Sequence, residues 1–190
     1  MQFPDHPFWD FSLATYGRDG VADACIALQE AHGADVNILL FCAWTGRNGA
    51  RLDRAQIEAA CSAVRGWHKE VVRPLRSVRR RLKSPLDGSP PSELQAALRA
   101  RIQKIEIDAE HIEQLRLAAL ADAPGFGGFG DFGASGASGA APLDSAAARA
   151  NMEAYLSVLG SGAGAETDAA ETEAALAAIA AAACRSDTGR

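Results

Sequence analysis

The chain has 190 residues, of which 48% are hydrophobic and 23% charged, a composition typical of a folded globular protein of about one domain. Its formal net charge of −5 excludes a protein that is basic over its whole surface, although it is compatible with a local basic patch. No apolar run approaches the roughly 20 residues of a membrane-spanning helix, and the N-terminal segment lacks the basic and apolar regions of a signal peptide. We therefore expect a cytoplasmic protein with no membrane partner.

Apolar residues recur at helical spacing through most of the chain. A sustained alternation of apolar and polar residues, which is typical of strands, is missing. Short helices are predicted over residues 8–16, 21–31 and 36–44. The third is apolar on nearly every side, which is typical of a helix at the centre of a bundle. Asp35 is expected to cap this helix, and Asn37, a polar residue within it, is expected to be hydrogen-bonded to a neighbour.

Two longer patterns predict an antiparallel helical hairpin. The first runs from residue 53 to residue 83, and Pro74 is expected to kink it rather than end it. The second covers residues 92–121, where Ser92 and Gln95 have the spacing of a capping box. The apolar positions expected to form the helix contacts are Ile57, Cys61, Val64, His68, Val71, Leu75, Val78 and Leu82 on the first helix, and Leu94, Leu98, Ile102, Ile105, Ala109, Ile112 and Leu115 on the second.

The C-terminal part differs in composition. Residues 123–143 are rich in glycine and phenylalanine and are expected to be a flexible linker. Residues 144–159 and 167–184 show helical spacing, but the second segment is mostly alanine and has few large side chains to bury. The predicted fold is all-α: a compact helical bundle over residues 3–122 with a long hairpin, then the linker, then an alanine-rich tail over residues 144–190 with weakly anchored helices.

We find no catalytic motif. The sequence contains no phosphate-binding loop, and its four cysteines form no CxxC pair: Cys25, Cys42, Cys61 and Cys184. Cys25, Cys42 and Cys61 lie among apolar residues at helical spacing and are expected to be buried, reduced thiols. Asp108 and His111, with Glu110 and Glu113 beside them, have the spacing found in di-metal bundles. Such a site needs a second pair, and His68 on the facing helix has no Asp or Glu three residues before it, so an ordinary polar face is predicted. His68 is expected to be a hydrogen-bonded, half-buried histidine. We therefore expect no cofactor, no metal and no enzyme.

Positive charge is concentrated in the middle of the chain. Residues 47–104 carry 14 Lys and Arg against 5 Asp and Glu, whereas all other residues carry 5 against 19. Pairing across the hairpin is expected to place Lys69 opposite Glu106. The same register places Arg65 opposite Glu110. Toward the turn, lysines and arginines outnumber acidic residues. The candidate partner-binding residues are Arg73, Arg76, Arg79, Arg80, Arg81, Lys83, Arg99 and Arg101.

Three interpretations of this basic patch stay open. It is a solvated face, which the acidic C-terminal region could neutralise; it binds an acidic protein; or it binds nucleic acid, although no groove-reading or base-stacking motif accompanies it. The leading hypothesis is a regulatory protein-interaction module that docks an acidic partner through the basic hairpin. Nucleic-acid binding through the same patch is the alternative, and a metal-dependent enzyme is the third hypothesis.

Residues 8–46 contain a dense set of distinctive short motifs: Trp9-Asp10-Phe11, Tyr16, Gly20-Val21, Ala24-Cys25, Leu28-Gln29, Gly33, Asp35-Val36-Asn37, Leu39-Leu40-Phe41 and Trp44. This block resembles the signature of a small bacterial family of uncharacterised proteins. The resemblance continues more weakly through Trp67 and residues 72–76 and does not extend to the C-terminal region. Some members are labelled suppressors of the heat-shock sigma factor RpoH. The resemblance therefore implies a regulatory role in the stress response and supplies no catalytic residues.

Overall fold

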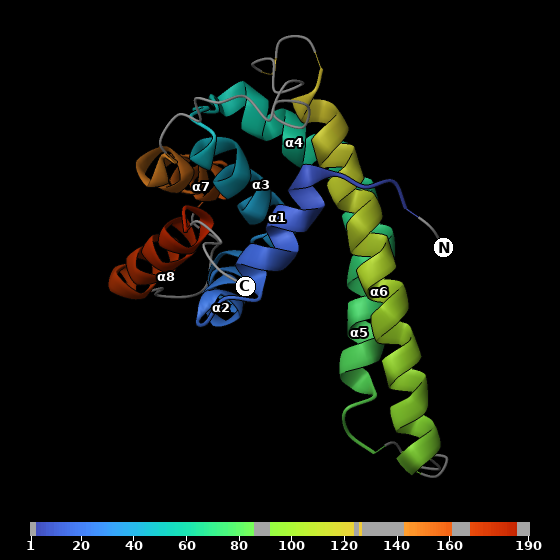
Figure 1. Cartoon of the computed structure of the whole chain (residues 1–190). Coiled ribbons are helices and arrows are strands. Elements are labelled where there is room, and N and C mark those ends of the chain that lie inside the picture. The colour runs from blue at the N-terminus through green and yellow to red at the C-terminus, as the bar shows by residue number, and fades with distance from the viewer. Residues whose placement is uncertain (1–2, 86–91, 124–125, 127–142, 161–167, 186–190) are drawn as a thin grey trace.

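The computed structural model describes residues 3–85, 92–123, 126, 143–160 and 168–185, and the regular structure within these ranges is entirely helical. The predicted all-α fold is therefore confirmed. Figure 1 shows a compact body from which a two-helix hairpin projects. The helices are α1 (Pro7–Tyr16), α2 (Val21–His32), α3 (Val36–Arg47), α4 (Arg54–Trp67), the π-helical turn η1 (His68–Val72), α5 (Arg73–Arg81), α6 (Ser92–Ala121), α7 (Ser145–Leu159) and α8 (Ala169–Ala183).

Helix α3 lies at the centre of the body, as its apolar sequence predicts. Its residues from Asn37 to Gly46 are all buried. The side chain of Asp35 caps the helix, because its Oδ1 accepts a hydrogen bond from the Asn37 N–H at 2.9 Å. Asn37 Oδ1 in turn accepts a hydrogen bond at 2.8 Å from Nε2 of Gln114 on α6. The predicted cap and the predicted bond to a neighbouring helix are both confirmed.

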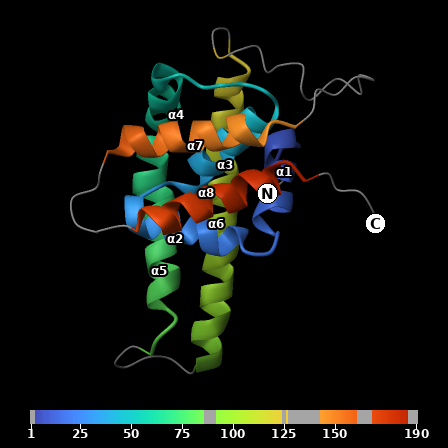
Figure 2. The same cartoon turned by 90° about the vertical axis from the view of Figure 1, so that its left-hand side faces the viewer.

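The expectation of weakly anchored C-terminal helices is wrong. Figure 2 shows α7 and α8 lying across the body beside α3 and α2. Met152 and Tyr155 of α7 and Leu176 and Ile179 of α8 are buried in the same core as α1 to α3. The small residues of these helices permit a close approach: a Cβ atom on Gly46 of α3 would lie 2.3 Å from the backbone of α7. Alanine-rich faces therefore strengthen the packing here by bringing helix axes together.

The predicted linker over residues 123–143 lies mostly outside the described residues. Phe126, which the structure describes, is 6% exposed, and its ring centroid lies 6.2 Å from that of Phe41 in α3. This phenylalanine is therefore part of the core. Among the helices that the structure describes, none is both long enough and apolar enough to cross a membrane.

Helices α4, η1 and α5 form one continuous helical segment, as predicted. A capping box begins it, in which the side chains of Asp53 and Gln56 each accept a hydrogen bond from the other residue's backbone N–H. Just before Pro74, the helix widens into a π-helical turn, where the Arg73 N–H donates to the carbonyl of His68. Proline cannot donate a backbone hydrogen bond, and the wider turn accommodates this within the helix.

The structure differs from the prediction in two respects: which residues of the two hairpin helices face each other, and which face of α6 packs against α5. The Trp67 indole Nε1 donates to the Ala109 carbonyl at 2.9 Å. Gln95, expected in a capping box, donates from Nε2 to the carbonyls of Leu82 at 3.1 Å and Ser84 at 3.0 Å. Helix α6 therefore extends past the end of α5 at the turn. For this reason, residues equally distant from the middle of the connection do not face each other.

The face of α6 turned toward α5 is more polar than expected. Its buried and half-buried residues recur at helical spacing and are Gln95, Arg99, Ile102, Glu106, Ala109 and Glu113. Of the apolar positions expected to make these contacts, Ile102 and Ala109 lie on this face. The prediction is wrong for three others, since Leu94 is 62% exposed, Leu98 is 47% exposed and Ile105 is 52% exposed. The outer half of the hairpin is thus held together largely by polar contacts and leaves apolar side chains on its surface.

Candidate functional site

Two of the eight predicted partner-binding residues hold the hairpin together. The guanidinium of Arg76 contacts Glu106 Oε1 at 3.2 Å and Glu110 Oε1 at 2.6 Å. Arg79 also pairs with Glu106, whose side chain is only 5% exposed. Burial opposes the charge on Arg76, but the two glutamates outweigh that effect and raise its pKa. Arg76 and Arg79 therefore contribute to the contact between the two hairpin helices.

The predicted ion pairs of Lys69 with Glu106 and of Arg65 with Glu110 are wrong. Lys69 and Arg65 are exposed, and Arg76 takes their place at both glutamates. The reason is the extension of α6 beyond α5 at the turn, which shifts the facing positions.

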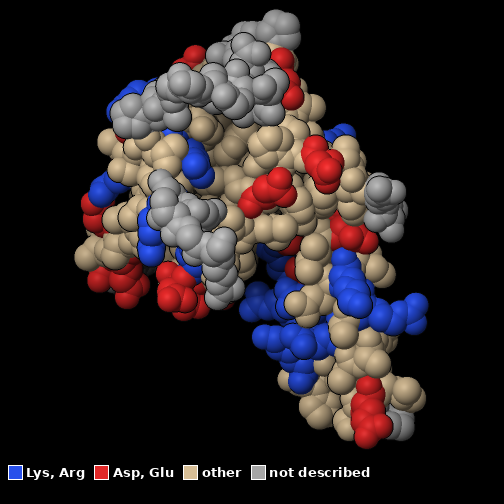
Figure 3. Space-filling model, viewed as in Figure 1, with Lys and Arg blue, Asp and Glu red and all other residues tan. Residues whose placement is uncertain are grey.

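The other predicted residues form a charged surface on the hairpin. In the space-filling view, Lys and Arg atoms gather where the hairpin leaves the body (Figure 3). Arg99 is half-buried, with an Nε atom that meets no hydrogen-bond partner among the described residues. We use the term basic hairpin surface for the exposed members of the predicted set, which are Arg73, Arg80, Arg81, Lys83 and Arg101.

Exposed apolar side chains accompany this basic surface. Leu94, Leu98, Arg101 and Ile105 recur at intervals of four, three and four residues, so they share one face of α6. On α5, Val78 is 48% exposed. We call Leu94, Leu98 and Ile105 the apolar stripe. This face of α6 is therefore amphipathic, with an exposed arginine between exposed leucine and isoleucine side chains.

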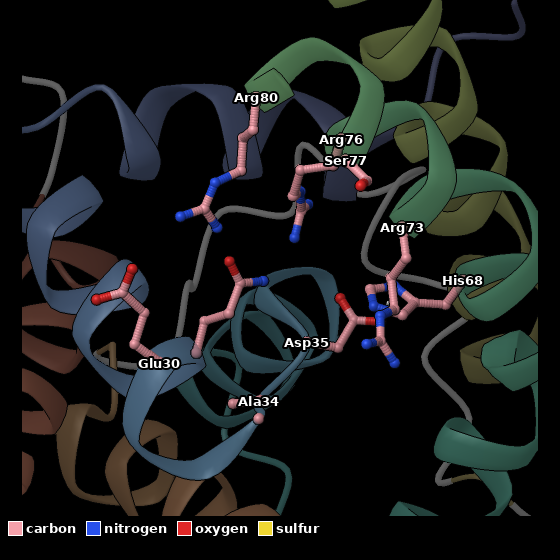
Figure 4. Close-up of a pocket in the computed structure, with 10 residues that line it drawn as sticks. Glu30, Ala34, Asp35, His68, Arg73, Arg76, Ser77 and Arg80 are labelled. Atoms are coloured by element: carbon pink, nitrogen blue, oxygen red, sulfur yellow. Dashed lines mark ion pairs between the residues drawn. The ribbon is translucent and has the colours of Figure 1, made fainter. Parts of the chain in front are cut away.

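A cleft of about 630 Å³ separates α5 from the corner between α2 and α3. Arg73, Arg76 and Arg80 point into it from α5, and Glu30 and Ala34 lie on the opposite wall (Figure 4). Asp35 and His68 also line the cleft. The cleft therefore presents arginines on one wall and a histidine–carboxylate contact beside them.

Three titratable side chains meet beside this cleft, and each comes from a different element. Asp35 Oδ2 lies 2.7 Å from His68 Nδ1. The two carboxylate oxygens of Glu113 lie 3.2 and 3.4 Å from the same nitrogen. The side chains are 9%, 17% and 0% exposed for Asp35, His68 and Glu113, respectively. We call these three residues the Asp–His–Glu cluster; within the described part of the chain, they form the group whose donor atoms could hold a metal ion.

The fold positions each member of the cluster. The Asp35 N–H donates to the Tyr155 hydroxyl at 2.8 Å, and one carboxylate oxygen caps α3, which leaves the other to face His68. The π-helical turn places His68 on the side of the long helix that faces Asp35 and α6. The residue after Glu113 is Gln114, whose bond to Asn37 fixes α6 against α3. All three side chains are therefore held by hydrogen bonds or by regular structure.

The electrostatics of the cluster follow from burial and contact. Burial disfavours the charged form of His68, but hydrogen bonds to Asp35 and Glu113 outweigh burial and raise the pKa of His68 to about 9. Burial alone would raise the pKa of Asp35, whereas its hydrogen bond to His68 lowers it. Burial raises the pKa of Glu113, and the neighbouring Asp35 raises it further. In the absence of another cation, a proton is therefore retained in the cluster.

The other titratable residues considered in the sequence do not converge. His111 stacks on Trp9, with ring centroids 3.9 Å apart, and Glu110 pairs with Arg76. In the described residues, Asp108, Glu110 and His111 therefore do not converge on one point.

The cysteines are free thiols. Cys25 and Cys42 are buried, and Cys61 and Cys184 are half-buried. Burial raises the pKa of Cys25 to about 12, so this thiol stays protonated near neutral pH.

Sequence reasoning identified the roles of Asp35 as a cap and of His68 as a bonded histidine, but it did not bring the two together. Glu113 was noted only beside the Asp108–His111 pair, and His68 only as a histidine on the facing helix. The contact between Glu113 and His68 becomes apparent only when the true register of the hairpin is known.

Together, the fold and the candidate site define an all-helical protein with a projecting basic hairpin and a buried histidine–carboxylate cluster. Residues 7–117, more than half of the chain, match the family described as "Protein of unknown function (DUF2390)". The chain belongs to this family. The matched range contains Asp35, His68 and Glu113. Neither the curated proteins nor the solved structures include a match to the chain.

Proposed function

We propose that this protein is a regulatory interaction module whose hairpin docks an acidic, amphipathic protein segment. The observation that carries the proposal is the combination of exposed leucine and isoleucine side chains with exposed arginines on one projecting hairpin. The apolar stripe supplies buried contact area, and the basic hairpin surface supplies attraction and orientation.

The charge of the outer hairpin supports an acidic partner. Glu106 and Glu110 are already used by Arg76 and Arg79, so they do not neutralise the exposed bases. Arg73, Arg80 and Arg81 are exposed on α5, and Arg101 is exposed within the stripe on α6. An acidic segment would gain long-range attraction that weakens as salt increases.

The apolar stripe favours a protein segment over nucleic acid. Leu94 and Leu98 are large side chains that a partner with its own apolar face can cover. A phosphate backbone offers no such face, and nucleic-acid surfaces usually add aromatic side chains for base stacking. Nucleic-acid binding through the same arginines is therefore the competing outcome of the test.

The proposed role is regulatory, cytoplasmic and non-enzymatic. The resemblance of residues 8–46 to relatives labelled as suppressors of the heat-shock sigma factor RpoH supports a bacterial stress-response context. Such suppression is compatible with an adaptor that holds an acidic segment of a regulatory protein.

The test uses site-specific photo-crosslinking in cells. A crosslinking residue at Leu98 samples the apolar stripe, and one at Leu13, which is 55% exposed on α1, samples a different surface. We expect Leu98 to capture a protein that Leu13 does not. The captured protein is then purified, and its binding to the full chain is measured across salt concentrations.

Two variants and a control decide the result. Arg80→Glu with Arg101→Glu removes charge, and Leu94→Ser with Leu98→Ser removes apolar contact; each should weaken binding at least about 10-fold. Arg51→Glu changes an exposed arginine outside the hairpin and should leave affinity unchanged. Capture that depends on intact nucleic acid, or binding equal in all variants, contradicts the proposal.

A further inference from the structure

We propose that Asp35, His68 and Glu113 form a binding site for one divalent first-row transition-metal ion. The proposal does not rest on the proposed partner docking, because no metal ligand belongs to the apolar stripe or to the basic hairpin surface, although Arg73 and Arg80 also line the cleft. Three observations carry the proposal: the convergence of the donor atoms, the count of hydrogen-bond donors inside the cluster, and its position beside an open cleft.

The donor atoms are close enough for one ion. One ligand atom from each of the three side chains lies within 4.8 Å of the other two. Ligand atoms bound at about 2 Å to a tetrahedral ion lie roughly 3.3 Å from one another, so small side-chain shifts suffice. His68 Nδ1 already lies 3.2 Å from Glu113 Oε1, and the His68–Asp35 contact of 2.7 Å would open slightly.

The cluster has too few hydrogen-bond donors for its carboxylates. His68 Nδ1 carries at most one hydrogen, and that nitrogen faces both Asp35 and Glu113. Asp35 lies closer to this nitrogen, whereas the hydrogen bonds of the ring are made with Glu113, so the two carboxylates compete for one hydrogen. In the described residues, Glu113 has no other N–H partner, although its side chain is fully buried. A buried carboxylate in this state requires a cation or a proton, and a divalent cation satisfies both carboxylates at once.

The donor set indicates the class of metal. One imidazole nitrogen and two carboxylate oxygens suit Zn²⁺, Mn²⁺ or Fe²⁺. Mg²⁺ and Ca²⁺ prefer sites made entirely of oxygen ligands. The imidazole nitrogen is therefore the feature that selects a transition metal.

The cleft provides the route to the site. Asp35 and His68 line it, whereas Glu113 closes the inner side of the cluster. Figure 4 shows that Asp35 and His68 meet at the edge of the cleft, with Arg73 nearby. A bound ion would therefore retain a coordination position toward the cleft, where water or a small anion could bind as a further ligand.

The test is metal binding by the full-length protein after removal of any affinity tag and treatment with a chelator. Zn²⁺ is titrated by calorimetry, and Co²⁺ is titrated by visible absorption, because the Co²⁺ spectrum reports its ligands. We expect one equivalent of each ion to bind, with a Kd for Zn²⁺ below about 10 µM at neutral pH. We expect bound Zn²⁺ to raise the thermal midpoint, because it links α3, η1 and α6.

Three variants and a control test the ligands. His68→Gln and Glu113→Gln should each weaken Zn²⁺ binding at least about 100-fold and change the Co²⁺ spectrum. Asp35→Asn keeps a side-chain oxygen for the helix cap and provides a third variant if either of the others fails to fold. His111→Gln removes a histidine stacked on Trp9 and should bind Zn²⁺ like the parent. Failure of the parent to bind either ion, or equal binding by parent and folded ligand variants, overturns the proposal and leaves the cluster as a proton-holding ion pair.

Discussion

At the residue scale, the Asp–His–Glu cluster makes the folding stability of the metal-free protein depend on pH. His68 has a pKa raised to about 9 from its ordinary value of 6.5. The unfolded chain therefore loses this proton at a lower pH than the folded chain does. The resulting stabilisation is fully present below pH 6.5 and is lost as the pH rises through 9. Glu113 acts in the same direction, because its raised pKa also makes the folded chain hold a proton that the unfolded chain releases.

We predict that the chelator-treated protein loses stability as the pH rises from about 7 to about 8.5, the interval in which His68 holds its proton only in the folded state. The measurement is urea denaturation at several pH values in this interval. His111 and His6 have lowered pKa values, and their effect on stability is confined to more acidic conditions.

The matched comparison is the double variant His68→Gln with Glu113→Gln, which removes the two groups of the cluster whose pKa values are raised. Its stability should vary less with pH in the same interval. A parent protein whose stability rises with pH there would show that His68 is not held in its charged form.

A second residue-scale prediction concerns Gly46, where α3 meets α7. A Cβ atom at this position would lie 2.3 Å from both the Cα and the N of Ala148, and backbone atoms cannot move aside as a flexible side chain can. Gly46→Ala should therefore destabilise the fold by about 3 kcal/mol. Gly66→Ala is the control, because a Cβ atom there meets nothing within 4 Å, and helix propensity predicts a gain of up to about 1 kcal/mol. Chemical denaturation of the two variants should give opposite signs.

At the scale of the elements, the polar contacts of the hairpin make a separate prediction. Arg76→Leu leaves the Glu106 and Glu110 carboxylates with less positive charge, and Glu106 is buried. Because Arg79 still pairs with Glu106, we expect a loss of about 1–3 kcal/mol in unfolding free energy. Arg80→Leu changes an exposed arginine on the same helix and should cost less than about 0.5 kcal/mol. Equal effects of the two substitutions would contradict the assigned roles.

The hairpin also shows how far sequence patterns can predict the contacts between elements. The two long helices and their antiparallel order followed from spacing, because apolar periodicity and a proline-rich connection are local signals. The spacing of apolar residues did not predict which face of α6 packs against α5. Apolar spacing favoured Leu94, Leu98 and Ile105, whereas ion pairs to Glu106 bring the neighbouring polar face inward. A pattern identifies apolar positions but not the partner that covers them.

The candidate site was predictable only in part for the same reason. The basic residues of α5 were evident from composition, although two of them turn out to be structural. Asp35, His68 and Glu113 are 33 and 45 residues apart along the chain, and their meeting depends on the hairpin register and on the corner before α3. No local motif encodes such a meeting. Tertiary packing determines it.

At the scale of the whole molecule, the core extends beyond the segment that defines the family. The family match ends at residue 117, but α7 and α8 contribute Met152, Tyr155, Leu176 and Ile179 to the core. Asn151 of α7 also accepts a hydrogen bond from the Leu52 N–H at 2.9 Å and donates one to the Ala50 carbonyl at 2.8 Å. The C-terminal helices therefore satisfy buried polar groups of the matched segment as well as covering its apolar face.

We predict that a chain ending at residue 143 does not fold cooperatively. Each of the four large side chains lost with α7 and α8 contributes about 1.5–3 kcal/mol by burial, so together they approach the 5–15 kcal/mol stability of a typical domain. The truncation also removes the Tyr155 hydroxyl that accepts the Asp35 N–H, so the Asp–His–Glu cluster loses a support. A chain ending at residue 185 keeps both helices and serves as the control. Thermal unfolding followed by circular dichroism should show a sharp transition for the control and a broad or absent one for the shorter chain. A sharp transition at the same temperature in both chains would mean that the matched segment folds by itself and that α7 and α8 only decorate it.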